Sequence, residues 1–158
     1  MPADAASGTR LDAFREASME FDSVYGQLAK SCGLSGTEYW ALSLIHQGVE
    51  TQREISQQLS LSRQTLNSAF KLLIRKGLIR LEPSKRDQRS KRAILTQEGH
   101  RFVEENILRV GRLEEEAWKT LTEEERTMLV RLTRQFSAAL LRSLRAHPTT
   151  HLSSSEDL

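Results

Sequence analysis

The fold is decided by residues 51–96, which read TQREISQQLSLSRQTLNSAFKLLIRKGLIRLEPSKRDQRSKRAILT. Thr51 and Glu54 form a capping-box pattern, which predicts the start of a short helix. Ser62 can cap a second helix, and Gly77 is suited to end it. Two helices joined by a turn of about four residues have the spacing of a helix-turn-helix.

A polar hairpin is predicted directly after these two helices. Residues 78–82 and 92–96 are short, β-compatible and partly alternating segments. Residues 83–91 between them are polar and begin with Pro83, as expected of a hairpin loop. A helix-turn-helix followed by such a hairpin predicts a winged helix, in a chain that is otherwise mainly α-helical.

The second helix of the pair has two unlike faces. At about 100° per residue, its apolar side chains gather on one face: Leu66, Ala69, Phe70 and Leu73. The other face contains no acid, and we expect it to contact DNA through Ser62, Arg63, Gln64, Thr65, Asn67, Ser68 and Lys71. Amides can bond base edges in the major groove, whereas Lys and Ser suit phosphate oxygens. The alternative is the solvated face of a purely structural helix.

The positive charge of the chain is concentrated in the same region. Residues 62–92 carry 10 basic and 2 acidic side chains, a net charge of +8, whereas the whole chain has a net charge of +2. Such concentration is typical of nucleic-acid binding. It would also suit a solvated basic face, or a winged-helix interaction module that docks an acidic protein.

Long helices are predicted on both sides of this region. The first covers about residues 9–32, another runs from Thr96 to about Lys119, and the last ends before Pro148. Narrow apolar seams repeat at spacings of three and four residues in the first and last of them: Phe14, Ala17, Phe21, Val24 and Leu28, then Leu129, Leu132, Phe136, Leu140 and Leu144. A two-fold homodimer would bury both seams and would match palindromic DNA. The alternative is burial of both seams within one monomer.

The hairpin and the helix after it also carry a family motif. Asp87-Gln88-Arg89 is followed by Leu95-Thr96-Gln97-Glu98-Gly99, and in this order and spacing the two segments resemble the wing signature of the MarR family. The resemblance extends over roughly residues 11–145. It implies an intertwined helical dimer whose terminal helices interlock, with two winged helix-turn-helix lobes.

The resemblance assigns roles to the wing. It implies that Asp87 braces the wing through a salt bridge and that Arg89 reaches the minor groove or its phosphates. The remaining basic side chains of the wing suit phosphates and narrow A·T-rich grooves: Lys85, Arg86 and Lys91. The alternative is that Arg89 only pairs with Asp87.

The function implied by the resemblance is that of a transcriptional regulator. We expect a repressor that binds a palindromic operator in double-stranded DNA as a homodimer and is released by a small aromatic or amphipathic effector. The effector pocket would lie between the dimer helices and the DNA-binding lobe. Its candidate lining residues are Phe21, Tyr25, Tyr39, Trp40 and His46, although aromatic side chains at such positions also suit a core.

Cys32, the single cysteine, offers an alternative regulatory input through oxidation. Oxidant-sensing relatives of the family place their cysteine near the start of the first helix, whereas Cys32 falls at the end of this one. The departure favours an unreactive cysteine. With one cysteine no internal disulfide can form, so we expect a reducing, cytoplasmic location.

Enzyme chemistry and membrane insertion are not indicated by the sequence. The four histidines have no metal-ligand spacing, and neither a phosphate-binding glycine loop nor a nucleophile elbow is present. We therefore expect no enzyme activity, no cofactor, no metal and no membrane partner. The expected organisation is a single domain over residues 9–146, with dimerisation helices 9–33 and 97–146 and a DNA-binding lobe 49–96. The flanking residues 1–8 and 147–158 are expected to be disordered.

Overall fold

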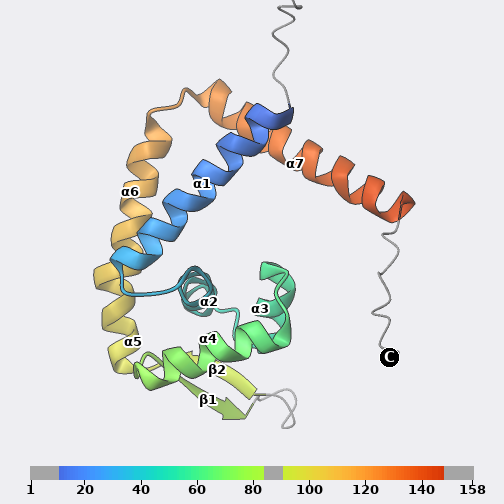
Figure 1. The fold of residues 1–158 in the computed structure, drawn as a ribbon. Helices are drawn as coiled ribbons and strands as arrows, with labels where there is room; N and C mark the ends of the chain where they lie inside the picture. The colour runs from blue at the N-terminus through green and yellow to red at the C-terminus, as the bar shows by residue number, and fades with distance from the viewer. Residues whose placement is uncertain (1–10, 84–90, 148–158) are drawn as a thin grey trace, which may run out of the picture. The chain divides into compact units, whose positions relative to one another are not determined.

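A computed structural model describes residues 11–83 and 91–147 of the 158-residue chain (Figure 1). The helices and strands follow in the order α1 Leu11–Ser31, α2 Gly36–His46, α3 Gln52–Leu59, α4 Arg63–Arg75, β1 Ile79–Pro83, β2 Lys91–Leu95, α5 Gln97–Phe102, α6 Leu108–Lys119 and α7 Glu123–Ala146. The chain divides into two compact units, residues 1–112 and residues 113–158. The mainly α-helical winged-helix architecture predicted from the sequence is confirmed.

Local capping fixes the helix starts, as predicted for the helices that follow Thr51 and Ser62. Ser35, Thr51 and Thr122 each accept a side-chain hydrogen bond from the backbone amide three residues on, and the carboxylate of the glutamate at that position accepts one from the backbone amide of the cap residue. Ser62 and Thr96 also cap the helices that follow them. Each such contact contributes on the order of 1 kcal/mol to helix stability. These helix starts can be predicted from the sequence because each capping hydrogen bond joins residues that are three apart.

The turn of the helix-turn-helix is held by its own backbone. Ser60 has a left-handed conformation, with φ of 51°. The Leu61 amide donates to the Ser56 carbonyl at 3.0 Å, and the Ser56 hydroxyl donates to the Leu61 carbonyl at 2.7 Å. These bonds end α3 and direct the chain into α4.

The hairpin is an antiparallel pair of strands in which Ile79 faces Leu95 and Pro83 faces Lys91. A short third segment joins its edge, since Thr51 forms an isolated bridge with Arg92 and the Ala93 amide donates to the Glu50 carbonyl at 2.7 Å. The Arg92 guanidinium lies 3.3 Å from carboxylate oxygens of both Glu50 and Glu82. The hairpin is thereby tied to the segment that precedes α3.

The core of residues 11–112 lies between the helix-turn-helix, α2 and the base of the hairpin. Its largest fully buried side chains are Phe70, Leu42, Ile55, Leu66, Leu73, Ile79, Val103 and Val110. Burial of each such side chain contributes about 1.5–3 kcal/mol. Leu66, Phe70 and Leu73 are the predicted apolar face of α4. Their burial turns the opposite face of α4 outward.

Gly99 lies unusually close to the base of the hairpin. A Cβ atom at this position would meet the Leu78 carbonyl oxygen at 2.0 Å. Thr96 holds the same junction, because its amide donates to the Leu78 carbonyl at 3.0 Å and its Oγ1 donates to the Gly77 carbonyl at 2.5 Å. Its Oγ1 also accepts from the Gly99 amide at 2.9 Å. The Leu-Thr-x-x-Gly motif therefore has a physical role, which is to close the hairpin onto the start of α5.

The uninterrupted helix expected from Thr96 to about Lys119 is interrupted by a π-helical turn over Val103–Ile107. Here the Leu108 amide donates to the Val103 carbonyl, and Asn106 Nδ2 donates to the Phe102 carbonyl at 3.1 Å. The wider turn places Val103 and Ile107 in the core. A pattern search at 3.6 residues per turn assumes a regular helix, so it does not reveal such a turn.

The long helix α7 buries none of its side chains within the described chain. Its seam is exposed at Leu129, Leu132, Phe136, Leu140 and Leu144. In α1 only Ala29 is buried, and Phe14, Phe21 and Val24 are exposed. Among the described residues, no helix is long and apolar enough to cross a bilayer.

Candidate nucleic-acid interface

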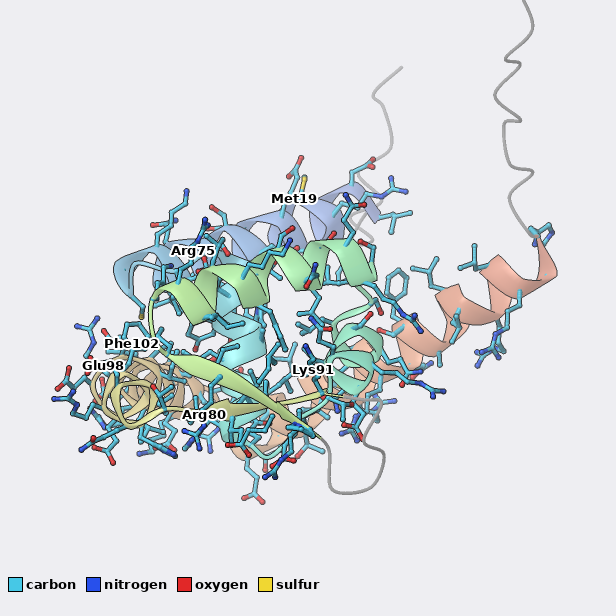
Figure 2. All side chains as sticks on the ribbon, turned by 90° about the horizontal axis from the view of Figure 1, so that it is seen from below. Met19, Arg75, Arg80, Lys91, Glu98 and Phe102 are labelled. Atoms are coloured by element: carbon cyan, nitrogen blue, oxygen red, sulfur yellow. The ribbon has the colours of Figure 1, made fainter. Side chains whose placement is uncertain are left out.

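The outward face of α4 carries the side chains predicted to contact DNA. The side chains of Ser62, Arg63, Gln64, Thr65, Asn67, Ser68 and Lys71 are all exposed, and so is that of Arg75. Figure 2 views the chain from the side on which α4 and the hairpin lie. Ile74 is 40% exposed on the same helix.

The polar groups of this face divide into two kinds. Ser62 Oγ accepts from the Thr65 amide at 3.1 Å and lies 2.8 Å from Thr65 Oγ1, while the Ser68 hydroxyl donates to the Gln64 carbonyl at 3.1 Å. These hydroxyls first serve the helix itself. Within the described part of the chain, no hydrogen bond or ion pair is assigned to the side chains of Gln64, Asn67 or Lys71. Two amides and a cation are therefore presented outward by a rigid, capped helix.

The wing is only partly described. Lys85, Arg86, Asp87 and Arg89 lie outside the described residues, so their predicted roles stay predictions. Lys91 is exposed at the start of β2, and Arg80 is exposed on β1 (Figure 2). Sequence reasoning omitted Arg80 because it lies in a strand rather than in the loop.

Arg80 pairs with an acid of its own strand. Its Nε lies 2.9 Å from Glu82 Oε1, and this hydrogen bond, against a smaller opposing effect of desolvation, holds the pKa of the Glu82 carboxyl below its ordinary value. Arg92 adds a second, weaker hydrogen bond to the same carboxylate. Glu82 is thus kept as an anion that neutralises part of the positive charge of Arg80 and Arg92.

The end of α4 is anchored by a contact that the sequence did not reveal. Lys76, the C-cap of α4, donates to Glu38 Oε1 at 2.6 Å and to the Gly33 carbonyl at 3.0 Å. Glu38 Oε2 accepts from the Ser35 amide at 2.9 Å. One buried carboxylate therefore joins the start of α2 to the end of α4. Sequence reasoning does not reveal this contact, because Glu38 and Lys76 lie 38 residues apart.

Two opposing effects act on the Glu38 carboxyl. Burial raises its pKa, but the hydrogen bonds from Lys76 and Ser35, together with attraction to the Lys76 charge, outweigh burial and leave the pKa below its ordinary value. A lowered folded-state pKa means that the contact stabilises the fold above the ordinary pKa of a glutamate. That contribution is lost as the pH falls through the lowered value.

Three of the five candidate effector residues meet in one surface groove. The groove has a volume of about 370 Å³ and is lined by Phe21, Asp22, Tyr25, Gly26, Gly36 and Trp40. The Tyr25 ring centroid lies 4.9 Å from that of Phe21 and 5.2 Å from that of Trp40. Tyr39 is buried in the core beside Trp40, and His46 is exposed at the end of α2; neither lines the groove.

Cys32 is buried, with its Sγ 3.9 Å from the Ser31 hydroxyl. Burial in apolar surroundings supports the interpretation of an unreactive cysteine. In the described ranges, no group of three or more His, Cys, Asp or Glu side chains is placed to hold a metal ion.

The capped helix pair, the outward polar face of α4 and the antiparallel hairpin together define a winged-helix protein. Residues 33–90 match the sequence model of the MarR family. A MarR family regulator from Neisseria meningitidis has a similar fold, with a TM-score of 0.75 at 18% identity over 88% of this chain and 99% of that one. The match over residues 33–90 and the shared fold support the resemblance to the MarR family that the wing motif suggested.

Two further solved structures are similar to this chain. MepR from S. aureus, in complex with DNA, matches with a TM-score of 0.66 at 26% identity over 80% of this chain and 94% of that one. MarR from E. coli, in its apo form, matches with a TM-score of 0.63 at 22% identity over 82% and 98%. Among curated proteins, no sequence matches the chain significantly.

Proposed function

We propose that this protein is a sequence-specific transcriptional repressor that binds a palindromic operator as a homodimer, with α4 in the major groove. The observation that carries the proposal is the outward face of α4, which presents Gln64, Asn67 and Lys71 without an acidic side chain. Amides can pair with adenine in bidentate fashion, and a lysine suits phosphate as a point charge. The proposal is supported by MepR from S. aureus, which has a similar fold and has been solved in complex with DNA.

In this proposal the wing contacts the duplex beside the recognition helix. Arg89 enters the minor groove or meets its phosphates, with Asp87 bracing the loop and Lys85, Arg86 and Lys91 contacting the backbone. The dimer is formed through the apolar seams of α1 and α7, which are exposed in the single chain. Two lobes related by a two-fold axis then match two operator half-sites. Its place of action is the cytoplasm, where the chromosomal target lies.

The groove at Phe21, Tyr25 and Trp40 is the proposed effector site. Its three rings supply apolar contact and Asp22 supplies the only charge among its lining residues, which suits a neutral or cationic aromatic compound. For a relative, BpsR from Bordetella bronchiseptica, regulation of DNA binding by 6-hydroxynicotinic acid has been described. Occupation of the groove would release the repressor from its operator.

Substitutions on α4 test the assignment of roles. Gln64→Ala or Asn67→Ala should weaken binding to the preferred operator by about 1–3 kcal/mol and binding to random duplex by less, so the specificity ratio should fall. Lys71→Ala should weaken both alike, because a phosphate contact carries no sequence information. Each variant is titrated against both duplexes. Unchanged ratios for Gln64→Ala and Asn67→Ala would show that a different surface reads the bases.

A further inference from the structure

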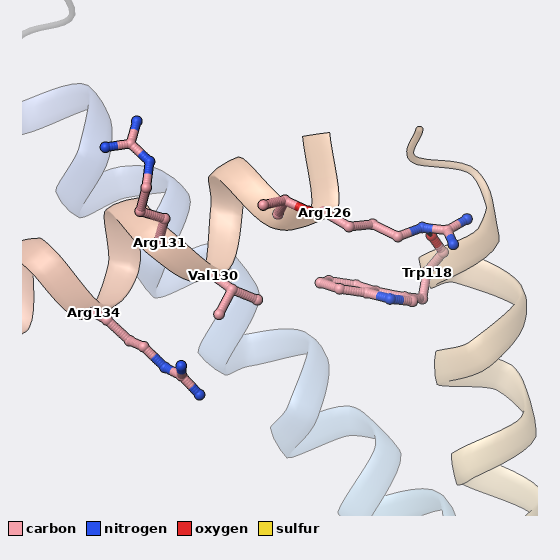
Figure 3. A pocket seen from close by; sticks show the side chains of 6 residues that line it. Trp118, Arg126, Val130, Arg131 and Arg134 are labelled. Atoms are coloured by element: carbon pink, nitrogen blue, oxygen red, sulfur yellow. Dashed lines mark hydrogen bonds between the residues drawn. The ribbon is translucent and has the colours of Figure 1, made fainter. Parts of the chain in front are cut away.

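Arg92, on β2, contacts two carboxylates that come from different parts of the chain. Its Nη1 lies 3.3 Å from Glu50 Oε2, in the segment before α3, and its Nη2 lies 3.3 Å from Glu82 Oε2 on β1. In Figure 3, by contrast, the arginines at the corner of α6 and α7 point in different directions. Arg92 therefore joins two separate segments, each through one of its terminal nitrogens.

The backbone brings the same three residues together. Arg92 is paired with Glu82 in the register of the hairpin, and it forms an isolated bridge with Thr51. The Ala93 amide donates to the Glu50 carbonyl at 2.7 Å. Side chains of directly opposed residues lie on the same face of a sheet, with their Cβ atoms about 5 Å apart. Arg92 is therefore the middle member of three paired segments, and the two outer segments supply the acids.

The Arg92 guanidinium is mostly enclosed by this arrangement. The Arg92 side chain is 20% exposed, and its Nε is buried without a hydrogen-bond partner among the described residues. An arginine that pairs with a single acid often uses two parallel N–H groups for the same carboxylate. Arg92 instead divides its terminal nitrogens between two acids, which is a geometry suited to bridging segments. Loss of either carboxylate would leave a mostly buried charge less well compensated.

The contact lies between the start of α3 and the end of the hairpin assigned to DNA. The next pair of the hairpin beyond Arg92 is Lys91 with Pro83, and Lys91 is exposed. On the other side, Thr51 is the N-cap of α3, the first helix of the helix-turn-helix. Arg92 thus connects the outer end of the hairpin to the residue at which the helix pair begins.

We propose that Glu50, Arg92 and Glu82 form a latch that sets the direction of the hairpin relative to α3 and α4, so that Arg92 is a positioning residue for DNA binding. The proposal rests on the proposed function, in which α4 and the hairpin contact one duplex. Fixing the spacing of these two contacts before binding reduces the entropy that binding has to remove. The alternative is that Arg92 contacts phosphate itself, while the two acids only repel the duplex.

Removal of Glu50 separates the two cases by the sign of the effect. Glu50→Ala adds one net positive charge per chain, so simple attraction to phosphate predicts tighter binding to duplex DNA. The latch predicts binding about tenfold weaker, because a charge-assisted contact that positions the hairpin is lost. Glu98→Ala is the matched control, since it removes the same charge from a local pair with Arg101 on α5. The control should leave the affinity unchanged or slightly higher.

A double-mutant cycle identifies the role of Arg92. Arg92→Met keeps an unbranched stem, and it should weaken operator binding about as much as Glu50→Ala. The double variant should bind no more weakly than Arg92→Met alone, since both changes break one contact. Each titration is made well below the unfolding temperature of the variant, so that loss of folded protein is not counted as loss of affinity. Additive effects of opposite sign, weaker for Arg92→Met and tighter for Glu50→Ala, would overturn the proposal.

Amide hydrogen exchange tests the latch without DNA. The Ala93 amide should exchange about tenfold faster in Glu50→Ala and in Arg92→Met, and at the wild-type rate in Glu98→Ala. Unchanged exchange of Ala93 in both latch variants would overturn the proposal, and so would faster exchange together with DNA binding as tight as that of the wild type. Failure of the wild type to bind any duplex would refute the proposed function instead, and the exchange of Ala93 would then decide the latch alone.

Discussion

Binding to duplex DNA should weaken about 10⁴- to 10⁵-fold when salt is raised from about 50 to 200 mM. If about eight to ten Lys and Arg side chains of the dimer contact phosphates, the logarithm of the binding constant should fall with the logarithm of salt with a slope of about −7 to −9. The concentration of 10 basic side chains in residues 62–92 is the source of this expectation. Fluorescence anisotropy with a random duplex, at several salt concentrations, measures the slope.

Variants that remove one charge show which Lys and Arg side chains produce the salt dependence of DNA binding. Lys71→Gln should reduce it by about one unit per bound lobe, whereas Arg15→Gln on α1, paired there with Asp12, should leave it unchanged. A parallel titration with polyglutamate tests the alternative of an acidic protein partner. A slope near zero, or tighter binding of polyglutamate than of the duplex, would contradict the account.

Disruption of the α7 seam should yield monomers and reduce operator affinity about 10³-fold or more. Leu132 and Phe136 are 48% and 42% exposed in the single chain, and in the proposed dimer they are buried against the partner copy. Leu132→Asp combined with Phe136→Asp would place two charges in that interface without partners, which is strongly unfavourable. A monomer would contact only one operator half-site. The dimer binds its second half-site at a high effective concentration because its two lobes are linked, and the monomer loses this advantage.

Light scattering at micromolar concentration measures the oligomeric state. Ala138→Asp is the control, since it introduces a charge on the side of α7 away from Leu132 and Phe136 and should leave the dimer intact. Circular dichroism checks that each variant remains helical. A wild-type chain that is monomeric under these conditions would refute the proposed dimer. Operator binding by the double variant at wild-type affinity would refute the need for the α7 seam in DNA binding.

Much of the fold was predictable because it depends on short-range contacts. The caps at Ser35, Thr51 and Thr122 join residues three apart, and the buried face of α4 follows from one helical period. The hairpin strands were placed to within one residue of the observed β1 and β2. These features can be predicted without knowing which distant side chains pack together.

The remaining features depend on tertiary contacts between distant residues. The pairing of Glu38 with Lys76 depends on how α2 and α4 pack, and the need for glycine at position 99 depends on the approach of Leu78. The separation of Tyr39 from the aromatic groove depends on which side of α2 enters the core. The roles of Lys85, Arg86, Asp87 and Arg89 stay predictions, since these residues lie outside the described chain.

Selection of bound sequences from a random duplex pool tests the central claim most directly. The wild-type protein should enrich one sequence with two-fold symmetry, whose half-sites are about one helical turn apart, as two symmetric recognition helices require. A Gln64→Ala and Asn67→Ala protein, selected in parallel, should enrich a degenerate sequence at the positions that those amides read. Recovery of no preferred sequence by the wild type, or of the same sequence by the variant, would contradict the assignment of α4 as the helix that reads DNA.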